Sequence, residues 1–318
     1  YVFDRVTGEP VWPIEERPVE KSNVPGEVSS PTQPFVTWPP PFDVQGVSHD
    51  DLIDFTPELR AQAIDIISRY KIGPLFTPPV VSRWEGPLAT LMMPSTVGGA
   101  NWAGGSFDPE TNMFYIQSST AVSPLGLVPG GDQSDMDWIR GMVTDPALGG
   151  PPDNGRQVPT VQGLPITKPP YGRITAFDMN TGNIAWQIPH GATPDEILTH
   201  PALEGINIPR TGRPGRGGVL TTSTLLISGE HGFATTPNGR GAMLRAYNKT
   251  NGNEVGAVYM PAPQTGAPMT YMLDGKQYVV LAVSGTSDRR FRNIQSSLEE
   301  NFSGKLLAYT LPEGYIHE

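Results

Sequence analysis

The sequence predicts an all-β fold, a partial β-propeller, and three observations lead to this prediction. The 318 residues include 36 Gly and 35 Pro, roughly twice the average share of these turn-forming residues. One short turn phrase recurs along the chain, and hydrophobic strands can be recognised around its copies. Sets of about four antiparallel strands, with a Trp docked in each set, are typical of β-propellers.

The recurring phrase is an aromatic residue, Asp or Asn, two further residues, Thr or Asn, and then Gly, followed by a hydrophobic strand. Copies begin at Phe3, Phe177 and Tyr247, and a looser copy begins at Phe107. Asp and Asn side chains hydrogen-bond to the backbone of a turn, and Gly tolerates positive φ. Because apolar and β-branched residues flank each copy, every copy predicts a β-hairpin.

Further strands extend these hairpins into blades. They are expected at residues 218–221, 225–228, 269–272, 277–283 and 305–309. We count two closing strands of one blade, two roughly complete blades and three strands of a fourth. An unclosed ring leaves strand edges unpaired, so we expect residues 1–318 to be part of a single β-propeller domain whose other blades come from elsewhere. The start at Tyr1, without an initiator Met, likewise predicts a fragment or a processed piece.

Two segments depart from the repeat. Residues 42–80 are predicted to form an inter-blade insertion containing a helix, which begins after Thr56 with Pro57 in its first turn and is closed by Gly73. Its apolar face is predicted to consist of Leu59, Ala63, Ile64, Ile67 and Tyr70. Residues 126–170 are predicted to form a long Pro- and Gly-rich loop, and residues 29–41 a shorter one, of the kind that covers the mouth of a propeller channel.

Composition excludes several classes of function. The net charge is −10, from 22 Lys and Arg against 32 Asp and Glu, which argues against nucleic-acid binding. The absence of Cys excludes thiolate zinc sites, iron–sulfur clusters and a covalently attached c-type haem within these residues. No stretch approaches the ~18 uninterrupted apolar residues of a membrane span.

The histidines predict no metal site. None of His49, His190, His200, His231 and His317 is spaced from another as a metal-binding pair would be, so surface or loop positions are expected. The Gly- and Arg-rich run 212–218 lacks the Lys-Ser/Thr ending and the following helix of a phosphate loop. It is expected to be a flexible loop that enters a strand.

The most informative run is Gly98–Gly105, where Asn101 and Trp102 stand among small residues just before a strand. Small neighbours let a flat ligand approach the backbone, Trp can stack on it, and Asn can hydrogen-bond to a carbonyl on its rim. This pattern suits a planar, carbonyl-bearing cofactor. On these features alone, an inter-blade turn with a docked Trp is an equally good reading.

Several motifs together resemble the pyrroloquinoline quinone (PQQ)-dependent dehydrogenases, and in particular their membrane-associated glucose, quinate and polyol dehydrogenase branch. They run in order along nearly the whole chain, at residues 1–10, 30–35, 76–79, 98–102, 168–176 and 268–271. The resemblance implies that the chain is the C-terminal half of an eight-bladed propeller with PQQ and a calcium ion in its channel.

The same resemblance implies a reaction. The hydroxyl of a sugar, polyol, cyclic alcohol or simple alcohol would pass a hydride to PQQ, and the electrons would go on to a quinone or a cytochrome, in the periplasm or at the periplasmic face of the inner membrane. The family's catalytic Asp, its quinone-polarising Lys or Arg and its calcium ligands would all lie upstream of Tyr1, which leaves no catalytic or metal-binding residue in this chain.

Four residues are candidates for cofactor binding by resemblance. Asn101 and Trp102 match the Asn-Trp step at the PQQ pocket, and Arg216 and Gly217 align with a step where several relatives place Trp before Gly-Gly. Arg216 departs from that pattern, so it would either pair with a PQQ carboxylate or line the channel mouth. The alternative function is a non-catalytic, Trp-docked β-propeller that acts as a scaffold.

Overall fold

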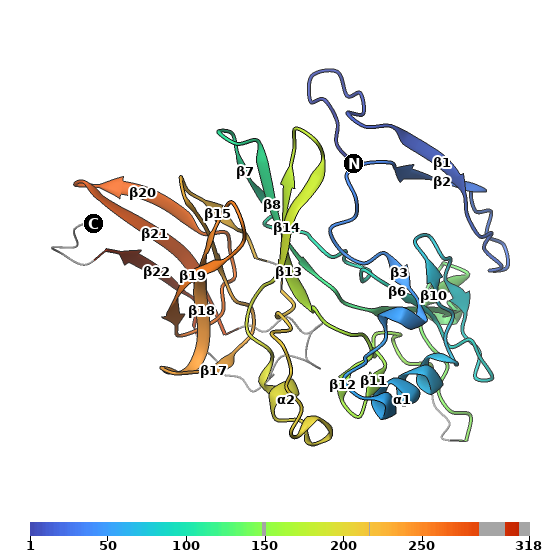
Figure 1. Ribbon diagram of the computed structural model, residues 1–318. Helices are drawn as coiled ribbons and strands as arrows, with labels where there is room; N and C mark the ends of the chain where they lie inside the picture. The colour runs from blue at the N-terminus through green and yellow to red at the C-terminus, as the bar shows by residue number, and fades with distance from the viewer. Residues whose placement is uncertain (148–150, 216, 286–302, 312–318) are drawn as a thin grey trace. The chain divides into compact units, whose positions relative to one another are not determined.

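The computed structural model describes residues 1–147, 151–215, 217–285 and 303–311 (Figure 1). The sequence predicts one domain over residues 1–318, whereas the contacts of the chain form two compact units. The first unit is Tyr1–Gly99 with Thr120–Lys168, and the second unit is Ala100–Ser119 with Pro169–Glu318.

The second unit contains three antiparallel sheets, and most of their strands are labelled in Figure 1. The first sheet has the order β14-β13-β8-β7 and consists of β7 (Gly105–Asp108), β8 (Met113–Ser119), β13 (Gly172–Asp178) and β14 (Asn183–Pro189). The second comprises β15 (Leu220–Thr221), β16 (Leu225–Gly229), β17 (Ala234–Thr236), β18 (Gly239–Asn248) and β19 (Glu254–Met260), with β17 and β19 both paired to β18. The third is β20 (Met269–Leu273), β21 (Lys276–Val283) and β22 (Lys305–Thr310). The predicted two blades and three further strands are therefore confirmed.

The turns of these hairpins contain the predicted side-chain hydrogen bonds and glycine conformations. At the β13–β14 turn, Asp178 Oδ1 accepts from the N–H of Asn180 at 2.9 Å, and Gly182 has a φ of 74°. At the β18–β19 turn, Asn248 Oδ1 accepts from the N–H of Thr250 at 2.9 Å. The copy at Phe3 is shorter in structure, because there a single bridge joins Phe3 to Pro10.

Trp186 of β14 connects two neighbouring sheets of the second unit, the β14-β13-β8-β7 sheet and the sheet that contains β16 and β18. Its indole Nε1 donates to the carbonyl of Lys249 at 3.1 Å, and the hydroxyl of Tyr115 donates to the same oxygen at 3.1 Å. A shared apolar core continues this contact between the sheets, with Ile174 on one side and Leu226 on the other. The docked Trp of a propeller blade is therefore Trp186.

We expect Gly252→Ala to destabilise the second unit by about 2 kcal/mol, because a Cβ there meets both positive φ and a crowded neighbour. Gly252 has a φ of +75°, and its Cβ would lie 2.8 Å from Cε3 of Trp186. Gly275 is a matched control, with a φ of +75° and open space around its Cβ. Urea denaturation of both variants measures the difference. Equal losses at the two positions would contradict the docking role.

The first unit consists of short strands and one longer helix. Its strands are β1 (Ile14–Pro18) and β2 (Thr32–Val36), β3 (Gly46–Val47) and β4 (Gly73–Pro74), β5 (Val80–Val81), β6 (Thr90–Met92), β9 (Ser123–Pro129), β10 (Trp138–Arg140), and β11 (Thr160–Val161) with β12 (Leu164–Pro165). Residues 126–170 and 29–41, expected as loops, thus include paired strands. Short helical segments are η1 (His49–Asp51) and η2 (Gly131–Gln133) here, and α2 (Asp195–Leu198) and η3 (Pro201–Leu203) in the second unit.

The predicted helix forms with a different end. Helix α1 (Pro57–Ile67) begins as expected, with the Thr56 hydroxyl accepting from the N–H of Leu59. It ends six residues before Gly73 because the backbone of Lys71 pairs instead with the segment around Thr90. Its buried residues are Leu59, Ala63 and Ile67. The prediction that Ile64 belongs to the buried apolar face is wrong, because its side chain is 41% exposed.

Candidate functional site

Three glycines of the second unit form a buried backbone segment, which we call the glycine shelf (Gly215, Gly217 and Gly218). The hydroxyl of Ser119 both donates to the carbonyl of Gly215 at 2.6 Å and accepts from its N–H at 2.7 Å. Gln264 Nε2 donates to the carbonyl of Gly218 at 2.9 Å. The expectation of a flexible loop over 212–218 is therefore wrong for the described residues, because side chains from other strands satisfy the backbone of this segment.

The shelf positions are occupied by glycine because a side chain at any of them would collide with neighbouring atoms. A Cβ on Gly217 would collide with the His231 ring and lie 2.9 Å from Gln117 Oε1. A Cβ on Gly218 would lie 2.5 Å from Cβ of Ala267 and 3.4 Å from Cβ of Ala103. Ala103 belongs to the turn that carries Asn101 and Trp102. The structure thus brings that turn and the glycine shelf together, although more than a hundred residues separate them in sequence.

The turn presents its aromatic side chain outward. Trp102 is 88% exposed, so the reading of this residue as a docked Trp is contradicted. Asn101 Oδ1 accepts from the N–H of Trp102 at 2.9 Å, and the carbonyl of Asn101 accepts from the N–H of Gly104 at 2.7 Å. These contacts close the turn and leave the indole face accessible. Arg216, the remaining candidate, lies outside the described residues.

Gln117 is a site residue that sequence reasoning missed. It follows Ile116 in β8, and its side chain is 3% exposed. Its Oε1 accepts from the N–H of Gly217 at 3.1 Å, whereas its Nε2 has no hydrogen-bond partner among the residues that the structure describes. In the sequence, Gln117 could have been noticed as the first of four consecutive polar residues, 117–120, that follow an apolar strand segment.

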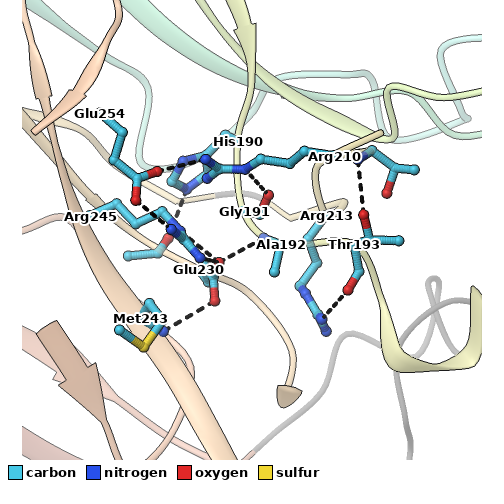
Figure 2. A network of polar contacts seen from close by, with 12 residues as sticks. His190, Gly191, Ala192, Thr193, Arg210, Arg213, Glu230, Met243, Arg245 and Glu254 are labelled. Carbon is cyan, nitrogen blue, oxygen red and sulfur yellow. Dashed lines mark hydrogen bonds and ion pairs between the residues drawn. The ribbon is translucent and has the colours of Figure 1, made fainter. Parts of the chain in front are cut away.

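A second polar network lies among β16, β18 and the segments 190–193 and 210–213 (Figure 2). At its centre is Glu230, which is 0% exposed. Its carboxylate pairs with Arg245 at 2.7 Å and accepts from the N–H groups of Ala192 at 2.7 Å and Met243 at 3.1 Å. Burial by itself would raise the pKa of Glu230, but the Arg245 and Arg213 guanidinium groups hold that pKa below its usual value.

His190 belongs to the same network and lies in the loop that follows β14, so the loop position expected for the histidines is correct for it and a surface position is not. It is 1% exposed. Its Nδ1 lies 2.9 Å from the Tyr247 hydroxyl and its Nε2 lies 3.1 Å from the carbonyl of Gly229. Desolvation lowers the pKa of His190 from 6.5 to about 4, so its imidazole is neutral at physiological pH.

The arrangement has a defined chemical character. Within the described ranges, no three or more His, Cys, Asp or Glu side chains gather as metal ligands. The exposed Trp102, the side-chain-free shelf beside its turn and the unsatisfied amide of Gln117 together fit a flat ligand that carries carbonyl or carboxylate oxygens.

The described helices include none that is long and apolar enough to cross a bilayer.

Known protein families and relatives are similar to this chain over most of its length. Residues 1–279 match the sequence profile of the family described as PQQ, glucose/ethanol/alcohol dehydrogenase, β-propeller domain. The chain is 31% identical over 301 residues to a quinate/shikimate dehydrogenase (quinone) of Acinetobacter baylyi, a match that covers 90% of this chain and 35% of that protein.

Two other relatives are similar at the same level. The quinoprotein glucose dehydrogenase of Escherichia coli is 29% identical, over 98% of this chain and 37% of that protein. The glycerol dehydrogenase large subunit of Gluconobacter thailandicus is 29% identical, over 98% of this chain and 41% of that protein. A solved quinohemoprotein alcohol dehydrogenase of Pseudomonas putida aligns with a TM-score of 0.43 at 16% identity, over 70% of this chain and 28% of that one. The chain thus spans 35 to 41% of the length of the three relatives matched in sequence.

Proposed function

Because the chain belongs to the PQQ glucose/ethanol/alcohol dehydrogenase β-propeller family, we propose that it forms the C-terminal part of a PQQ-dependent dehydrogenase. The enzyme oxidises the hydroxyl of a sugar, polyol, cyclic alcohol or simple alcohol. The single observation that best supports a role in cofactor binding is that the Asn101–Trp102 turn lies beside the glycine shelf, since a Cβ on Gly218 would lie 3.4 Å from Cβ of Ala103.

Each candidate residue has a distinct task in this proposal. Trp102 stacks on the cofactor ring, because its indole is the exposed flat surface of the turn. Asn101 hydrogen-bonds to a quinone carbonyl, and Gly217 lets the ring approach the backbone closely. Arg216 pairs with a cofactor carboxylate or lines the channel mouth. When bound, PQQ supplies the hydride acceptor for oxidation of the alcohol.

The remaining machinery is assigned outside this chain. The catalytic Asp, the Lys or Arg that polarises the quinone and the calcium ligands are proposed to lie in the remaining propeller blades, upstream or on a separate chain. The electron acceptor is a quinone or a cytochrome, and the location is the periplasm or the periplasmic face of the inner membrane. The net charge of −10 argues against nucleic acid as a partner.

Asn101→Ala tests the proposal in the full-length protein that contains this chain. After reconstitution of the apoprotein with PQQ and calcium, we expect the Kd for PQQ to rise about tenfold, the effect of one lost hydrogen bond to the cofactor. Asn238→Ala is the control, because Asn238 lies exposed at the β17–β18 turn and should leave the Kd unchanged. An unchanged Kd in Asn101→Ala would remove this residue from the site. Absence of PQQ binding by the parent protein would refute the proposed function.

A further inference from the structure

Among the described residues, only the oxygen of the Gln117 side-chain amide forms a hydrogen bond. A backbone N–H can only donate, so the atom that lies 3.1 Å from the N–H of Gly217 is the acceptor Oε1. The planar amide therefore directs Nε2, with its two N–H donors, to the other side. Among the described residues Nε2 has no acceptor, although the side chain is almost completely buried. Buried donors in folded proteins are nearly always paired, so an unpaired one indicates a missing ligand or water.

The strand register places Gln117 beside the turn that carries Trp102. Gly105, the first residue of β7, pairs with Ile116 of β8. Gln117 is therefore the first residue of β8 beyond the end of β7, level with the residues just before Gly105. Its contact with Gly217 places it at the glycine shelf as well. The unpaired amide thus lies where the turn and the shelf meet.

The neighbouring polar residues of β8 do not share this property. Ser119 lies on the same face of the strand as Gln117, because side chains alternate, but its hydroxyl is already engaged in two hydrogen bonds with Gly215. Ser118 lies on the opposite face. Among the described residues, Gln117 is thus the polar residue of β8 that both holds the shelf, through Oε1, and keeps an unpaired donor on the other side of its amide.

We propose that Nε2 of Gln117 donates a hydrogen bond to a carbonyl or carboxylate oxygen of bound PQQ. The inference rests on the proposed function and adds to it a residue that touches the cofactor. A neutral amide suits this role because its N–H groups match the quinone carbonyls and the carboxylates that PQQ carries, without introducing a charge into the pocket. One planar group then ties the cofactor to the backbone of Gly217.

Two substitutions in the full-length protein separate this role from shelf support. Gln117→Glu keeps an oxygen that accepts from Gly217 but replaces the donor with a second acceptor, and Gln117→Met removes both functions at similar length. Ser119→Ala is the matched control, because it removes hydrogen bonds to the shelf while leaving the Gln117 donor in place. The Kd for PQQ, with calcium present, is measured by quenching of tryptophan fluorescence, and the Tm of each apoprotein is measured alongside.

We expect both Gln117 variants to bind PQQ at least about tenfold more weakly than the parent, as expected for a hydrogen bond to a charged or strongly polar acceptor. Ser119→Ala should lower the Tm of the apoprotein and leave the Kd close to the parental value. An unchanged Kd in both Gln117 variants would overturn the inference, and so would an equal loss of affinity in Ser119→Ala. Parent protein that binds no PQQ would overturn the proposed function together with it.

Discussion

Glu230→Gln is expected to lower the free energy of unfolding by about 3–5 kcal/mol, the usual cost of removing one partner from a buried ion pair. Glu230 is fully buried and pairs with Arg245 at 2.7 Å. The fully buried Arg213 guanidinium depends on the same negative charge, since Glu230 is the largest of the charges that favour its protonated form. Glutamine would leave two buried or partly buried cations without this compensation.

Glu254→Gln is the control for this experiment. Glu254 also pairs with Arg245, at 2.7 Å, but its side chain is 27% exposed. Glu254 pairs with Arg210 as well, at 2.6 Å, and because solvent screens these partly exposed pairs, their loss should cost about 1 kcal/mol. Urea denaturation gives both values. If the two substitutions cost the same, Glu230 is not the centre of the network in Figure 2.

The second large effect concerns pH and His190. Its pKa is about 4 in the folded protein and 6.5 as a free side chain. Between these values the unfolded chain binds a proton that the folded protein does not, so stability falls as the pH is lowered from 6.5 to 4. The shift corresponds to about 3 kcal/mol. Above pH 6.5 this contribution is fully present, and below pH 4 it changes no further.

The charged and titratable groups that face His190 are Glu230, Arg210, Arg245 and Tyr247. Carboxylates also titrate in this range, so the measurement is a difference. Urea denaturation at intervals between pH 4 and 8 is compared for the parent and His190→Gln, which cannot take up the proton. The parent should lose about 3 kcal/mol more than the variant on acidification. Parallel pH profiles would show that His190 is not held neutral by burial.

The turns and hairpins could be predicted from the sequence because their determinants are local. Asp178 and Asn248 hydrogen-bond to backbone groups two residues away, and Gly182 supplies the positive φ within the same turn. Strand alternation then extends each hairpin into a sheet. A sequence pattern contains all of this information, so the three sheets of the second unit were predictable in number and position.

The end of helix α1 was not predictable in the same way. The capping chemistry at Thr56 is local and placed the start correctly. The end depends on Lys71, whose N–H bonds to the carbonyl of Ala89. That partner is remote in sequence, and its hydrogen bond competes with continuation of the helix. A prediction from helix propensity alone extends the helix to Gly73, because it takes no account of the hydrogen bond between Lys71 and Ala89.

The same distinction holds for the candidate site. The sequence by itself determined the family resemblance, the hairpins and the turn with Asn101 and Trp102, because small residues around one amide and one indole are visible in a single run. Only the tertiary structure decided that this turn lies beside the glycine shelf, and that the buried Gln117 there has a donor without a partner in the described part of the chain. Gln117 and Gly217 are 100 residues apart. A buried polar group acquires its role from such distant partners, and their positions are set by how the sheets pack.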